Sequence, residues 1–94
     1  MSESVRCQAI VKGRVQGVAF RHATCLKAGE LGVGGSVRNR PDGSVMVQVQ
    51  GTEDAVRRLL SWLHVGPRMA IVEQVEVTWQ TPFEGGAGSF EVRY

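Results

Sequence analysis

The chain has 94 residues, of which 43% are hydrophobic and 21% charged; this fits a single globular domain over residues 1–94 and excludes a multidomain protein. No stretch approaches the ~20 consecutive apolar residues of a membrane-spanning helix, and residues 1–6 lack the basic and apolar regions of a secretory signal. A soluble, cytoplasmic protein without a membrane partner is therefore expected. The two cysteines, Cys7 and Cys25, are too few for an extracellular disulfide scaffold. Reduced thiols are expected, and a pairing of the two stays open.

The formal net charge is only +2, but the charge is distributed unevenly. Residues 1–40 carry seven basic and two acidic side chains, whereas residues 41–94 carry four basic and seven acidic ones. The positive first part favours an anionic partner that binds there. An ordinary solvated surface explains the same counts, so charge alone does not decide between the two.

The chain is predicted to begin with a strand and a helix. Residues 5–12 alternate between apolar and polar side chains, the period of a strand with one buried face. Residues 13–19 break that period. Apolar or small side chains then recur at helical spacing from Phe20 to Leu31, and Gly32 follows as the expected C-cap.

A hairpin and a second helix are predicted next. Residues 36–40 and 44–50 flank Pro41-Asp42-Gly43, a sequence typical of a tight turn. Thr52 is placed to cap a second helix, whose first turn holds the acidic side chains that a helix N-terminus favours and which is expected to end near residues 64–67. Apolar side chains at i, i+3, i+4 and i+7 from Val56 give this helix one buried face.

The last part of the chain is predicted to hold a strand over residues 74–79, a glycine-rich loop over 84–89 and a short terminal strand over 90–94. The main elements therefore follow the order strand, helix, strand, strand, helix, strand. This order predicts an α+β fold, the ferredoxin-like split βαβ sandwich (βαββαβ), with an antiparallel sheet and both helices on one face. The fold serves enzymes, sensors and RNA-binding modules, so it does not select a function.

The segment from Gly13 to Arg21, between the first strand and the first helix, carries the chemistry. Its two glycines allow turns that point successive N–H groups inward, and the helix start adds unpaired N–H groups and a positive dipole end. The Arg21 guanidinium can meet two phosphoryl oxygens at once. The loop thus predicts an anion site, with a plain glycine turn beside a solvated arginine as the alternative. It matches neither of the common glycine-rich nucleotide motifs.

The same segment, Gly13 to Arg21, resembles the first signature of the acylphosphatase family. The run Gly35-Ser36-Val37-Arg38-Asn39, followed by Gly43, Val45 and Gly51, resembles the second signature at the right separation. With the ending Phe90 to Tyr94, the resemblance extends from about Val5 to Tyr94. The chain departs from the family at Ser36, where a large aromatic residue is usual, and at Met46, where many relatives carry a carboxylate. The first departure is expected to affect substrate fit or local stability.

The resemblance implies hydrolysis of the carboxyl-phosphate bond of an acyl phosphate to a carboxylate and inorganic phosphate. Phosphate is also expected to be a competitive inhibitor, because it presents the same oxygens as the substrate to the loop and Arg21. By motif position Arg21 would bind the phosphoryl group and Asn39 would orient the attacking water. The phosphate-binding loop would comprise Arg14, Val15, Gln16, Gly17, Val18, Ala19 and Phe20. A carboxylate leaves without protonation, so positioning and charge stabilisation are sufficient and no general acid is needed. A monomer without a cofactor is expected.

Other candidate residues have simpler interpretations. His22 adjoins Arg21 but points about 100° away on a helix, and a surface role is expected for it. Histidines and cysteines are few and widely spaced, so no metal site is predicted. RNA binding would need exposed aromatic residues on the central strands, which lack them, so no nucleic-acid partner is predicted. The alternative is a non-catalytic anion-binding regulatory module of the same fold, which would have no need for Asn39.

Overall fold

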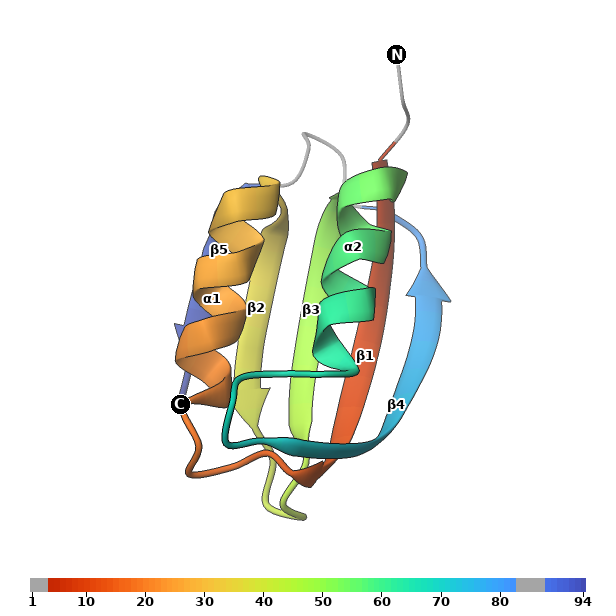
Figure 1. The fold of residues 1–94 in the computed structure, drawn as a ribbon. Helices are drawn as coiled ribbons and strands as arrows, with labels where there is room; N and C mark the ends of the chain where they lie inside the picture. The colour runs from red at the N-terminus through yellow and green to blue at the C-terminus, as the bar shows by residue number, and fades with distance from the viewer. Residues whose placement is uncertain (1–3, 83–87) are drawn as a thin grey trace.

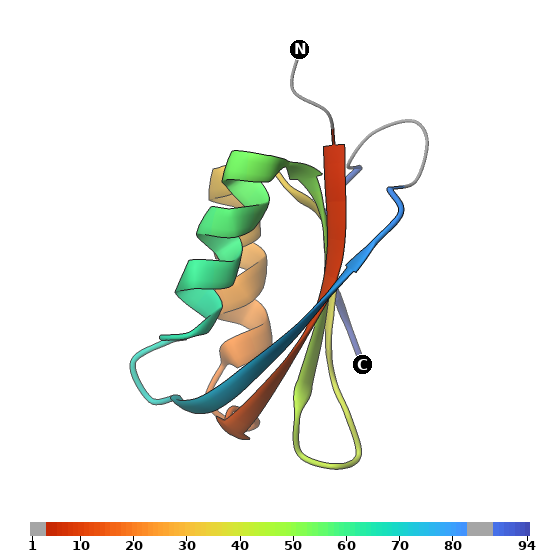
Figure 2. The same cartoon turned by 90° about the vertical axis from the view of Figure 1, so that its right-hand side faces the viewer.

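Five strands form one sheet in the computed structural model, which describes residues 4–82 and 88–94. The elements follow the chain as β1 (Ser4–Arg14), α1 (Phe20–Leu31), β2 (Gly34–Asn39), β3 (Val45–Thr52), α2 (Glu53–Leu63), β4 (Ile71–Gln80) and β5 (Phe90–Arg93). The strand order in the sheet is β4-β1-β3-β2-β5. Both helices cover the same face and leave the other face open (Figures 1 and 2). The ferredoxin-like α+β architecture is thereby confirmed.

The sheet is mixed, and the expectation of a wholly antiparallel sheet is wrong at one edge. The pairs β1·β3, β1·β4 and β2·β3 are antiparallel, but β5 runs parallel to β2. β4 runs opposite to β2, so β4 finishes at the side of the sheet where β2 begins. β5 starts from that same side and pairs with β2 at the edge of the sheet far from β4. The last strand therefore finishes beside the start of α1 (Figure 1).

The core lies between the helices and the covered face of the sheet. Cys7, Ala9 and Val11 of β1 are fully buried there, as the period of two predicts. The helix termini also follow the sequence: the Thr52 hydroxyl accepts from the Ala55 N–H at 3.3 Å, and Gly32 ends α1 with φ of 71°. Burial raises the pKa of the Cys7 thiol to about 11, against which Arg57 acts weakly. Both cysteines are free thiols.

Two strands are longer than the sequence indicates. β1 continues to Arg14 and β4 begins at Ile71, because these ends pair with one another after an irregularity between Lys12 and Gly13. Gly13 permits this with φ of 130°, and a Cβ there would lie 2.2 Å from the Ile71 carbonyl oxygen. The alternation of apolar and polar residues does not predict these strand ends, because the pairing register and the close approach of the two backbones determine them. Most of the predicted loop over 84–89 lies outside the described residues.

Candidate active site

The loop between β1 and α1 is fixed at both ends by buried side chains. Val15 and Phe20 are 1% and 2% exposed, and the Phe20 ring lies 5.8 Å from that of Trp62, centroid to centroid. Between them Gly17 has φ of 75° and Ala19 φ of 61°. Ala19 is the one residue other than glycine with positive φ in the part of the chain that the structure describes. A non-glycine residue in this conformation costs ~1 kcal/mol or more, so the surrounding packing must hold the loop in shape.

This loop leaves a row of backbone donors unused. Ala19 is the N-cap of α1, yet its side chain cannot cap, so the first turn has no side-chain partner. The N–H groups of residues 17–22 donate to no other residue within 4–82 and 88–94, and the first helical bond runs from the Ala23 N–H to the Ala19 carbonyl at 3.0 Å. The left-handed backbone at Gly17 and Ala19 and a helix N-terminus together make a donor surface suited to an anion.

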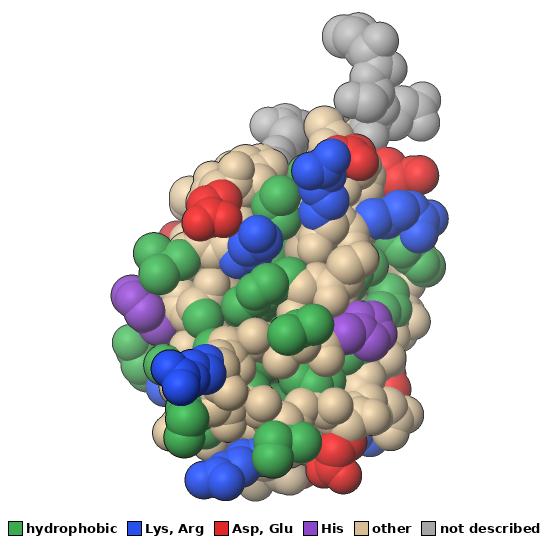
Figure 3. Space-filling model, viewed as in Figure 1, with side chains coloured by type: hydrophobic (Ala, Val, Ile, Leu, Met, Phe, Trp, Pro, Cys, Tyr) green, Lys and Arg blue, Asp and Glu red, His purple; other side chains and the backbone are tan. Residues whose placement is uncertain are grey.

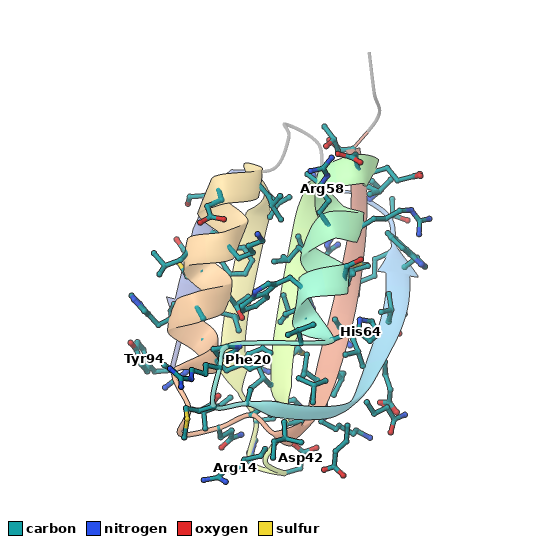
Figure 4. All side chains as sticks on the ribbon, in the orientation of Figure 1. Arg14, Phe20, Asp42, Arg58, His64 and Tyr94 are labelled. Carbon is teal, nitrogen blue, oxygen red and sulfur yellow. The ribbon has the colours of Figure 1, made fainter. Side chains whose placement is uncertain are left out.

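Arg21 lies at the edge of this donor surface, in the first turn of α1. Its Nη1 donates to the Arg93 carbonyl at 3.1 Å, and its guanidinium carbon sits 4.5 Å from the centroid of the Tyr94 ring. Figure 4 shows Tyr94 beside the start of α1. The side chain is half-buried and makes no ion pair with a described carboxylate. Its charge is thus held in place and remains available to an anion.

A cavity of about 180 Å³ brings these groups together with Asn39. It is lined by Val15, Gly17, Ala19, Phe20, Arg21, His22, Asn39, Val92 and Tyr94. Asn39 is the last residue of β2, and within the described part of the chain its side-chain amide has no hydrogen-bond partner. One arginine, an amide with free donor and acceptor, and four further residues of the segment 17–22 with unused N–H groups therefore line one small space.

Gln16 connects the loop to the β2–β3 hairpin. Its Nε2 donates to the carbonyls of Arg40 at 2.7 Å and Ser44 at 2.9 Å, the two residues that close the turn. The turn is further held by Asp42, which accepts from the Ser44 hydroxyl at 2.6 Å and the Ser44 N–H at 2.9 Å. These bonds lower the pKa of the Asp42 carboxyl. The loop and the strand end that carries Asn39 are thereby tied together.

The predicted loop residues divide into two sets. Val15, Gly17, Ala19 and Phe20 line the cavity together with Arg21 and Asn39, whereas Arg14, Gln16 and Val18 do not. Arg14 is exposed at the lower end of the fold in Figure 4. Val18 packs against the core and Gln16 bonds to the hairpin.

Sequence reasoning missed three residues that line the cavity. Val92 and Tyr94 belong to the end of the chain, which reaches the cavity because β5 pairs in parallel with β2. The motif-like ending Phe90 to Tyr94 was the available signal for them. His22 is exposed, as expected, and it also lines the cavity. On the helix-covered face, charged side chains of both signs lie scattered among hydrophobic ones (Figure 3).

Residues 4–82 and 88–94 contain no group of three or more His, Cys, Asp or Glu side chains placed to hold a metal ion. No helix in these ranges is long and apolar enough to cross a membrane.

Fold and cavity together define a small α+β sandwich with a cavity, lined by Arg21 and Asn39, where its first helix begins. The acylphosphatase family model matches residues 7–92. An acylphosphatase of Anaeromyxobacter dehalogenans is 48% identical over 94 residues, the whole of both chains. The structure of acylphosphatase from Bacillus subtilis aligns with a TM-score of 0.90 at 32% identity, covering 96% of this chain and 99% of that one. An acylphosphatase from Coxiella burnetii gives 0.89 at 33% identity, with 96% and 93% covered. The chain belongs to the acylphosphatase family, which supports a hydrolase acting on acyl phosphates.

Proposed function

We propose that the chain hydrolyses acyl phosphates by direct attack of a water molecule that Asn39 orients, while Arg21 and the loop ending at Phe20 hold the phosphoryl group. The observation that carries this proposal is the shared cavity: Arg21 and Asn39 come from different elements and line the same space of about 180 Å³. That volume is small, so the cavity suits the phosphoryl group, with the acyl part of the substrate directed outward.

The loop supplies the charge stabilisation that the reaction needs. The unused N–H groups of residues 17–22 and the guanidinium of Arg21 are donors fixed in position before substrate arrives. Preorganised donors of this kind stabilise the charge on phosphoryl oxygens without reorganising during the reaction. Arg21 can keep its bond to the Arg93 carbonyl through one nitrogen while its other N–H groups bind the phosphate.

Asn39 supplies the position of the nucleophile. An amide can accept a hydrogen bond from water through its oxygen and donate one through its nitrogen, and this amide has both groups free among the described residues. The oxygen of the water forms the new bond to phosphorus, and the bond between phosphorus and the acyl oxygen breaks. The carboxylate leaves with that electron pair, and the proton of the water passes to a phosphate oxygen of the substrate. No side-chain acid or base is required.

This mechanism uses no metal ion or cofactor, and we propose that the protein acts as a cytoplasmic monomer. The decisive experiment follows hydrolysis of benzoyl phosphate by the purified full chain in the presence of a chelator. Turnover well above the spontaneous rate, undiminished by the chelator, is the expected result. Binding of phosphate without turnover would instead identify a non-catalytic anion-binding module. Turnover lost to the chelator would contradict the metal-free mechanism.

A further inference from the structure

The open face of the sheet carries a groove of about 480 Å³ that has no residue in common with the cavity described above. It lies over β2, β3 and β5, the strands that carry Ser36, Met46 and Glu91, and Arg6 of β1 also lines it. Side chains alternate between the two faces of a strand, so Arg38 reaches this groove while the adjacent Asn39 reaches the cavity on the helix side. The groove is therefore a separate candidate site.

Two arginines of this groove are direct neighbours across the sheet. Arg38 of β2 and Arg93 of β5 are Cα partners in the parallel pairing, and both side chains line the groove. Like charges placed directly opposite each other on one face of a sheet are destabilising. Arg93 has a partial counter-charge in Glu91, 3.5 Å away and 60% exposed. Arg38 has no ion pair or hydrogen bond within residues 4–82 and 88–94. An anion between the two guanidinium groups would remove this repulsion.

The floor of the groove adds an unmatched acceptor. Gln48 lies on the neighbouring strand β3, and its Nε2 donates to Gln8 Oε1 at 2.9 Å. The Gln48 Oε1 atom is buried and has no hydrogen-bond partner among the described residues. A buried acceptor without a donor is destabilising, so a ligand that brings an O–H group to it would be favoured. Met46 provides apolar surface nearby, and the small side chain of Ser36 leaves the space open.

We propose that this groove binds a small hydroxylated phosphate monoester, with the phosphate between Arg38 and Arg93 and a hydroxyl group donating to Gln48. The pair of planar guanidinium groups matches the oxygens of a phosphate dianion. The volume is in the range of small-molecule sites rather than that of an extended macromolecular interface. A phosphate monoester is not an acyl phosphate, so this ligand is distinct from the substrate of the proposed reaction.

The test is a titration of the full chain with glycerol 3-phosphate at low ionic strength, followed by NMR of the arginine Nε–Hε and glutamine amide signals. The Arg21→Gln variant is titrated alongside the wild type, so that binding in the cavity is recognised and separated. Saturable shifts at Arg38, Arg93 and Gln48 that persist in Arg21→Gln are expected. Signals that do not move up to 50 mM ligand, or that move only in proportion to ionic strength, would overturn the proposal.

Two variants and a control locate the ligand. Arg38→Gln is expected to weaken binding about tenfold, since one charged hydrogen-bonding group is lost. Ser36→Phe keeps every charge but fills the groove, and it is expected to abolish binding while the amide spectrum remains folded. Arg58→Gln removes an exposed arginine of α2 that pairs with Asp54 at 2.9 Å, and it should leave the affinity unchanged. Equal affinity in all three would refute the site.

Two competing ligands complete the test. Inorganic sulfate is expected to bind more weakly than glycerol 3-phosphate because it brings no hydroxyl group to Gln48. Equal affinity for sulfate would indicate general attraction of anions and contradict the proposal. Tighter binding of a short polyglutamate peptide would identify an acidic polypeptide as the partner and would equally overturn a small-molecule site.

Discussion

Replacing Gln16 by alanine tests whether the contact between the loop and the hairpin supports the fold and the site. Its side-chain amide is half-buried and donates to two carbonyl oxygens, those of Arg40 at 2.7 Å and Ser44 at 2.9 Å. Each carbonyl keeps a second donor, because the Gly43 N–H donates to Arg40 at 3.1 Å and the Arg40 N–H to Ser44 at 2.8 Å. The substitution therefore removes two hydrogen bonds without leaving a carbonyl wholly unpaired.

The expected loss of stability follows from these two bonds. A net contribution of about 1 kcal/mol for each gives a decrease of roughly 2 kcal/mol in the free energy of unfolding. For a domain of this size that decrease corresponds to a fall in Tm of roughly 8–16 °C. Gln16→Glu should be worse than Gln16→Ala, because a carboxylate would place negative charge against two carbonyl oxygens and donate to neither.

Thermal and urea unfolding of both variants provides the assay. Gln74→Ala is the matched control, since the Gln74 amide makes a single exposed contact with Glu76 at 3.3 Å. Its effect should stay within about 0.5 kcal/mol. Turnover should also fall in Gln16→Ala relative to this control, because the tied hairpin carries Asn39. The reasoning would be refuted if Gln16→Ala were as stable as Gln74→Ala, or if Gln16→Glu were more stable than Gln16→Ala.

Three further predictions concern pH, product and specificity. The pKa of the Cys7 thiol is raised to about 11 in the fold against about 9 unfolded, so the unfolded chain ionises first and stability is lost as pH rises from about 9 to 11. Urea titrations should show that the free energy of unfolding falls by about 1.4 kcal/mol between pH 8 and pH 10, and that Cys7→Ala lacks this loss. An equal pH dependence of the unfolding free energy in the two proteins would contradict this assignment. Inorganic phosphate should inhibit hydrolysis of benzoyl phosphate competitively, because it offers the same oxygens to Arg21 and the loop; a purely noncompetitive pattern in initial rates would count against that site. Ser36→Trp should change stability and keep both activity and substrate preference, since Ser36 lines the open face and not the cavity; a folded variant with no activity, or with a changed substrate preference, would show that Ser36 belongs to the site.

The sequence predicted helices and strands correctly where a local pattern of residues is sufficient to determine them. The period of two in β1, the apolar face of α2 and the caps Thr52 and Gly32 are local signals, and the structure confirms them. The parallel pairing of β5 with β2 was not predictable in this way, because it depends on which edge of the sheet is free after β4 is placed.

The same distinction holds for the site. The glycine-rich loop and the motif resemblance led to Arg21 and Asn39, and the structure places both in one cavity. The motif could not predict that Gln16 binds the hairpin instead of lining the cavity, since its partners are backbone carbonyls 24 and 28 residues away. Tyr94 was missed as a lining residue for a related reason: its position beside Arg21 follows from the pairing of β5.

In the proposed mechanism Asn39 orients the attacking water while Arg21 binds the phosphoryl group. The most direct measurement is kcat for benzoyl phosphate and the affinity for inorganic phosphate in Asn39→Ala, with Arg21→Gln measured alongside and folding checked by circular dichroism. We predict that Asn39→Ala loses about a hundredfold or more in kcat with its phosphate affinity near that of the wild type, whereas Arg21→Gln loses both. Full turnover in Asn39→Ala, or an equal loss of phosphate binding in the two variants, would contradict this division of roles.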